Sequence, residues 1–123
     1  MSAMRQTAAE GLGGPTRSPD RPPLVDTHCH LDVSDFDADR DRVLERARAA
    51  GVVDLVIPAI HKAGWPWLVA YCDSAPGLYP ALGLHPVYLD RHGIQDVQAL
   101  ESLITERRPV AIGEIGLDYF VRG

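Results

Sequence analysis

The stretch DRDRVLERARAAGVVDLVIP, from Asp39 to Pro58, decides the fold class of this chain. Up to Ala50 its apolar residues follow helical spacing, and Gly51 is a typical residue after the end of a helix. From Val52 onward the residues are apolar and largely β-branched, which predicts a buried strand. A helix that leads through one glycine into a buried strand is typical of parallel sheets covered by helices.

The same alternation extends in both directions along the chain. The pattern predicts strands at 24–27, 77–84 and 110–115 and helices at 65–74 and 94–104. For the resulting order β-α-β-α-β-α-β we expect either a doubly wound sheet or a (β/α) barrel. No Gly-x-Gly-x-x-Gly motif follows the first predicted strand, which argues against a dinucleotide-binding version of the doubly wound sheet.

The composition is that of a folded protein with one modest domain. Of the 123 residues, 46% are hydrophobic and 24% are charged. The formal net charge of −5 indicates no basic nucleic-acid surface, although a bound divalent cation can itself contact phosphate. Residues 1–22 are rich in Gly, Pro, Ser, Thr and Ala, so we expect a disordered tail before a folded unit at residues 23–123.

Cysteine usage and hydropathy indicate a cytoplasmic protein. Cys29 and Cys72 fit no disulfide framework, which favours a reducing compartment. No apolar run approaches the roughly 18 residues that a membrane span needs, and the N-terminus lacks the apolar core of a signal peptide. We therefore expect a cytoplasmic protein that binds no membrane and has no obligate protein partner.

Every predicted strand is followed by a histidine or a carboxylate. The segments concerned are His28-Cys29-His30, Pro58-Ala59-Ile60-His61, Gly83-Leu84-His85-Pro86 and Gly113-Glu114-Ile115-Gly116-Leu117-Asp118. All the histidines except His92 lie in these segments. Because active sites of (β/α) barrels lie at the carboxyl ends of the strands, this clustering predicts a functional site at that edge of the sheet.

The strongest candidates for metal ligands are His28, His30 and Glu114. Side chains two residues apart in a strand point to the same side, so the two histidines can direct imidazole nitrogens at one point, with Asp26 one step behind. Imidazole binds divalent transition metals, and an added carboxylate favours ions used in hydrolysis. Glu114 lies in an otherwise apolar strand, where a carboxylate is costly unless it is paired or bound to a metal.

Two further residues have alternative interpretations. His85, in a Gly-x-His-Pro sequence, is either a site residue or a histidine that caps a turn. Asp118 is either a site residue, a helix cap or a hydrogen-bond partner. The remaining candidates are interpreted as structural, namely His61 in a surface loop and Cys29, Trp65 and Trp67 in packing.

Three segments resemble one known family. They are Asp26–Asp32 (DTHCHLD), Ala81–Pro86 (ALGLHP) and Ala111–Tyr119 (AIGEIGLDY). In sequence, order and separation they resemble the TatD family of metal-dependent hydrolases, and the resemblance covers residues 24–120. The His-x-His pair alone is shared with other hydrolases, whereas the Gly-Glu-Ile-Gly-Leu-Asp segment is much more specific.

The resemblance implies a fold, a metal centre and roles for individual residues. The fold is α/β, a (β/α)8 barrel of the TIM type, of which this chain would supply about the first four units. The cofactors are two divalent metals (Mg, Mn or Zn), with His28 and His30 as ligands of one and Glu114 as the bridging and catalytic carboxylate. His85 and Asp118 are then expected to contact the substrate.

The resemblance also implies an activity and exposes a difference in length. Members of the family are deoxyribonucleases, typically 3′-5′ exonucleases, so DNA or another phosphoester is the expected substrate. A carboxylic-ester or amide hydrolase, for example one that acts like a D-aminoacyl-tRNA deacylase, and a non-catalytic remnant remain the alternatives. A whole barrel needs about 250 residues, roughly twice this chain. We therefore expect an N-terminal half with little or no activity alone.

Overall fold

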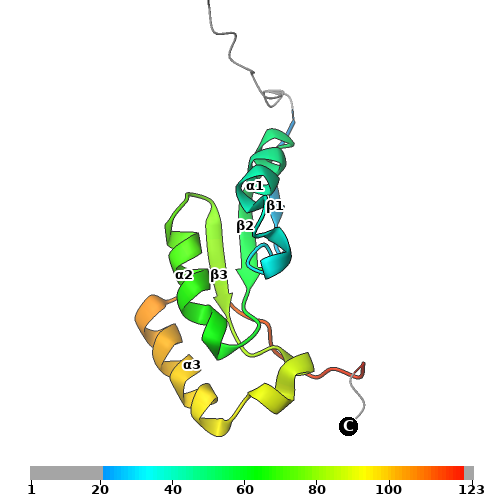
Figure 1. Ribbon diagram of the computed structural model, residues 1–123. Coiled ribbons are helices and arrows are strands. Elements are labelled where there is room, and N and C mark those ends of the chain that lie inside the picture. The colour runs from blue at the N-terminus through cyan, green and yellow to red at the C-terminus, as the bar shows by residue number, and fades with distance from the viewer. Residues whose placement is uncertain (1–20, 121–123) are drawn as a thin grey trace, which may run out of the picture.

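Four parallel strands form one sheet in the order β1-β2-β3-β4 in the computed structural model, which describes residues 21–120 (Figure 1). The strands are β1 (Leu24–Asp26), β2 (Val52–Pro58), β3 (Leu78–Leu82) and β4 (Ala111–Ile112). The connecting helices are α1 (Arg40–Ala49), α2 (Trp65–Asp73) and α3 (Ile94–Arg107). The disordered tail expected at residues 1–22 lies, up to residue 20, outside the described residues.

The strand order distinguishes between the two predicted architectures. Each strand pairs in parallel with the next one along the chain, from Leu24 opposite Val52 to Leu82 opposite Ile112. A doubly wound sheet reverses its strand order at a switch point, whereas a (β/α) barrel adds each strand beside the previous one. The described sheet is therefore part of a barrel, and the prediction of a partial (β/α) barrel is confirmed.

The core lies between the sheet and its helices. In β2 the alternate residues Leu55 and Ile57 are buried, and so are Leu78 and Leu82 of β3. The helices contribute Leu44 from α1, Leu68 and Cys72 from α2 and Leu100 from α3 to the same apolar cluster. In Figure 1, α1 lies along β2 and α2 lies along β3, while α3 lies on the other side of α2. No helix within residues 21–120 has the length and apolar character to cross a membrane.

Most predicted elements are present with small shifts in their ends. β2 spans the predicted residues, and α1 and α2 begin within one residue of the predicted starts. The third and fourth strands are shorter than the predicted 77–84 and 110–115. In α3 the predicted apolar stripe is only partly covered, because Leu100 is buried whereas Ile94 and Val97 are exposed.

Short 3₁₀ helices that the pattern did not predict follow the first three strands. They are η1 (Ser34–Phe36), η2 (Lys62–Gly64) and η3 (Pro86–Arg91). The last two begin with histidine caps. His61 Nδ1 accepts a hydrogen bond from the Gly64 N–H at 3.2 Å, and His85 Nδ1 accepts one from the Val87 N–H at 3.1 Å. His85 therefore caps η3, as one of its two interpretations expected, and its predicted contact with substrate stays a prediction.

Gly83, just after β3, allows the chain beyond β4 to come close. A Cβ at this position would lie 2.4 Å from the carbonyl carbon of Gly113 and 2.6 Å from the carbonyl oxygen of Glu114. The Gly113 N–H donates to the Leu82 carbonyl at 3.0 Å, and the Glu114 N–H donates to the Ala59 carbonyl beyond β2 at 3.1 Å. These bonds bring Glu114 over the carboxyl edge of the sheet.

Candidate metal centre

Two nitrogens and one oxygen converge at the carboxyl edge of the sheet. His28 Nε2 and His30 Nε2 lie 3.3 Å apart, and Glu114 Oε2 lies 3.3 Å from the first and 3.2 Å from the second. Within the part of the chain that the structure describes, these are the residues that could together hold a metal ion, with ligand atoms within 4.8 Å of one another. The three side chains predicted as ligands are thus brought together.

The two histidines reach this point from a loop and not from a strand. β1 ends at Asp26, two residues before His28. The Asp26 carboxylate accepts a hydrogen bond from the His28 N–H at 3.1 Å, and the Cys29 N–H donates to the Val56 carbonyl of β2 at 3.3 Å. Backbone hydrogen bonds of this loop, and not strand alternation, therefore place the imidazoles, and the Asp26 carboxylate accepts one of these bonds.

His85 contacts the other oxygen of the glutamate. Its Nε2 lies 3.1 Å from Glu114 Oε1. Because His85 Nδ1 accepts the Val87 N–H, a neutral ring carries its proton on Nε2 and donates it to the carboxylate. The two oxygens of the Glu114 carboxylate therefore have different neighbours. Oε1 accepts a hydrogen bond from His85, and Oε2 faces His28 and His30.

The donor set fits a divalent cation. Glu114 Oε2 is buried and has no hydrogen-bond partner, although two imidazole nitrogens lie within 3.3 Å of it. Metal bonds of about 2.0–2.1 Å place two ligands of one ion roughly 3.0–3.4 Å apart, which is the spacing of these three atoms. A buried carboxylate oxygen without a partner is costly, and a bound cation would satisfy it.

The other predicted site residues lie apart from this group. Asp118 accepts a hydrogen bond from the Phe120 N–H at 2.5 Å and has no described contact with the three converging side chains. His61 is partly buried and lines a pocket of about 300 Å³ together with Asp32. The expectation that Asp118 contacts substrate stays a prediction.

The residues interpreted as packing residues differ in exposure. Trp65 is buried and its Nε1–H donates to the Gly83 carbonyl at 3.0 Å, which fixes the glycine beside Glu114. Trp67 is 45% exposed, and its ring stacks on Tyr71. Cys29 is partly buried against the core, and this burial raises the pKa of its thiol. Trp65 thus supports the chain beside the site, and none of the three residues belongs to the described group of candidate metal ligands.

Asp32 is the residue near the site that sequence reasoning did not assign. Asp32 lies two residues after His30, just as His30 lies two residues after His28, and this regular spacing is the one signal in the sequence that points to Asp32. Its Oδ1 lies 3.9 Å from His30 Nδ1. Burial raises the pKa of the Asp32 carboxyl group, against the lowering effects of its own backbone N–H and of nearby basic side chains.

Fold and geometry together define a (β/α) barrel protein with a candidate metal centre at the carboxyl ends of its strands. The family model described as TatD related DNase matches residues 25–123. The chain therefore belongs to the TatD family, as its three motifs predicted.

Relatives with names and structures agree with this assignment. The chain is 41% identical over 100 residues to the uncharacterized metal-dependent hydrolase YjjV of Escherichia coli K12, a match that covers 79% of this chain and 38% of that protein. It is 39% identical over 108 residues to the human deoxyribonuclease TATDN3, covering 80% and 39%. The crystal structure of YjjV, a TatD homologue, matches with a TM-score of 0.72 at 39% identity, covering 80% and 39%. The chain thus spans about two fifths of the length of these relatives.

Proposed function

We propose that this chain carries part of the active site of a metal-dependent hydrolase that cleaves phosphodiester bonds in DNA with two divalent cations. The observation that carries the proposal is the convergence of His28 Nε2, His30 Nε2 and Glu114 Oε2 within 3.3 Å of one another. The names of the relatives, which include a deoxyribonuclease, support DNA as the substrate class.

The side chains of the site have separable tasks. His28 and His30 would hold one cation, and Glu114 would extend a carboxylate to it that can also bridge to a second. A bound divalent cation supplies charge stabilisation at a phosphoryl oxygen and a water of lowered pKa. The His85 Nε2–H holds the Glu114 carboxylate in place, which favours a positioning role for His85 over direct contact with substrate.

We further propose that the chain alone has little or no hydrolase activity. Among the described residues one group of three ligands comes together, which is enough for one cation and not for a pair. Three side chains, with water in the remaining positions, are enough to bind one cation. Binding of one cation by the chain should therefore be measurable even though hydrolysis of DNA is not.

The test is a titration of the purified chain with Mn²⁺ by calorimetry, followed by an assay with single-stranded DNA. We expect one site, weakened at least tenfold by His28→Ala and by Glu114→Gln. Ser102→Ala, on the distant α3, is the matched control and should bind as the unaltered chain does. Absence of Mn²⁺ binding would contradict the metal centre. Degradation of DNA at a rate abolished by Glu114→Ala would contradict the proposed inactivity.

A further inference from the structure

Two buried polar atoms that lack hydrogen-bond partners lie near each other, one in the His30 ring and the other in the Asp32 carboxylate. His30 Nδ1 and Asp32 Oδ1 are both buried, neither has a hydrogen-bond partner, and they lie 3.9 Å apart. A buried donor and a buried acceptor are each costly when left unpaired, and pairing them removes both costs. The distance exceeds that of a direct hydrogen bond by less than 1 Å, which a rotation of the Asp32 side chain can close.

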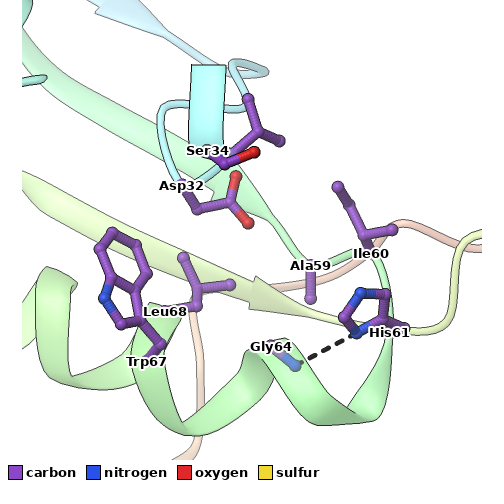
Figure 2. A pocket seen from close by; sticks show the side chains of 9 residues that line it. Asp32, Ser34, Ala59, Ile60, His61, Gly64, Trp67 and Leu68 are labelled. Carbon is purple, nitrogen blue, oxygen red and sulfur yellow. Dashed lines mark hydrogen bonds between the residues drawn. The ribbon is translucent and has the colours of Figure 1, made fainter. Parts of the chain in front are cut away.

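The backbone of Asp32 is held on both sides. Arg40 at the start of α1 donates from Nε to the Leu31 carbonyl at 2.7 Å and from Nη2 to the Val33 carbonyl at 2.9 Å. An approach of Asp32 to His30 therefore has to come from movement of the Asp32 side chain. Figure 2 shows its carboxylate pointing into the pocket of about 300 Å³ that Ala59 and other residues line, which gives it room to turn.

No hydrogen bond from the other two basic groups, Arg40 and His61, to the Asp32 carboxylate is present among the described residues. Arg40 donates to Leu31, to Val33 and to Asp37. His61 uses Nδ1 to accept the Gly64 N–H, as the dashed line in Figure 2 shows. Of these three basic groups, His30 is the one with a buried ring nitrogen that lacks a partner, so it is the natural donor to Asp32.

We propose that Asp32 is a positioning residue that accepts a hydrogen bond from His30 Nδ1 and so directs the lone pair of His30 Nε2 at the cation. A neutral imidazole carries one proton, and with Nδ1 protonated its Nε2 is free to bind a metal. Carboxylates behind metal-bound histidines act in this way and raise the basicity of the ring. The inference rests on the proposed metal centre, but the proposed hydrogen bond does not require a bound metal.

The first test measures which nitrogen of His30 carries the proton in the metal-free chain. Long-range ¹H–¹⁵N correlation spectra, recorded at a pH where the ring is neutral, distinguish the two forms. We expect His30 to be protonated on Nδ1 in the unaltered chain and to become a mixture of both forms in Asp32→Leu. Protonation of His30 on Nε2 in the unaltered chain would overturn the proposal, and this readout does not require any variant to fold.

The second test measures Mn²⁺ affinity by calorimetry. We expect Asp32→Leu to bind about 10–100-fold more weakly and Asp32→Asn to lose less, because its amide oxygen can still accept the Nδ1–H. Ser34→Ala, in the same pocket, is the control and should bind normally. If His28→Ala abolishes binding while Asp32→Leu does not, the role of Asp32 is wrong and the metal centre stands. If the unaltered chain binds no Mn²⁺, the metal centre fails and the spectra alone decide the hydrogen bond.

Discussion

At the scale of single residues, His85 is the side chain for which two roles, orienting Glu114 and contacting substrate, lead to different expectations. Its ring links the Val87 N–H to Glu114 Oε1. We predict that His85→Ala weakens Mn²⁺ binding about tenfold, because a hydrogen bond to a charged group contributes roughly 1.5–3 kcal/mol and Glu114 is partly exposed. Calorimetric titration checks the value. His85→Gln, whose side-chain amide can still donate, should recover part of the loss.

An alternative role for His85 gives a different result. If this histidine served only to contact substrate, both variants would bind Mn²⁺ as tightly as the unaltered chain. Metal affinity therefore distinguishes a residue that orients Glu114 from one that meets the phosphate, and it does so without any measurement of turnover.

At the scale of elements, the contact between the ends of β3 and β4 determines where Glu114 lies. Gly83→Ala would force a Cβ to within 2.6 Å of backbone atoms of Gly113 and Glu114. We predict a loss of about 1–3 kcal/mol in unfolding free energy, typical of an overpacked site, together with weaker Mn²⁺ binding. Urea unfolding and calorimetry measure the two effects. Gly64→Ala is the control, since its Cβ would meet only the His61 ring at 3.7 Å. Equal stability of the two variants would contradict the prediction.

Elements with a strong local pattern were predictable from the sequence. The apolar, β-branched run of β2 and the helical spacing of α1 depend on neighbours along the chain, so both were found with ends shifted by at most one residue. β4 was predicted too long because Glu114 leaves the strand to bond Ala59, which lies 55 positions earlier. Such a long-range backbone bond has no local signal in the sequence.

The grouping of the three candidate metal ligands was predictable to a similar degree. Residue types and spacing identified His28, His30 and Glu114, since few other roles satisfy two imidazoles and a carboxylate at strand ends. The hydrogen bond of His85 to Glu114 and the proximity of Asp32 to His30 depend on side-chain orientations in loops. Those orientations follow from three-dimensional contacts, such as the Arg40 bonds to Leu31 and Val33, that no periodicity expresses.

At the scale of the whole molecule, a short segment beyond β4 exposes large apolar side chains. Leu117, Tyr119 and Phe120 are 88%, 90% and 89% exposed, and exposed apolar patches bind hydrophobic dyes and partner surfaces. We predict that Leu117→Ser combined with Phe120→Ser lowers the fluorescence of bound anilinonaphthalene sulfonate. Unfolding free energy should change by no more than about 0.5 kcal/mol, since exposed side chains contribute little to stability. Leu68→Ala, in the core, is the contrasting variant and should cost about 2–5 kcal/mol. Unchanged dye fluorescence in the double variant would show that the dye binds elsewhere on the molecule and that this segment is not its site.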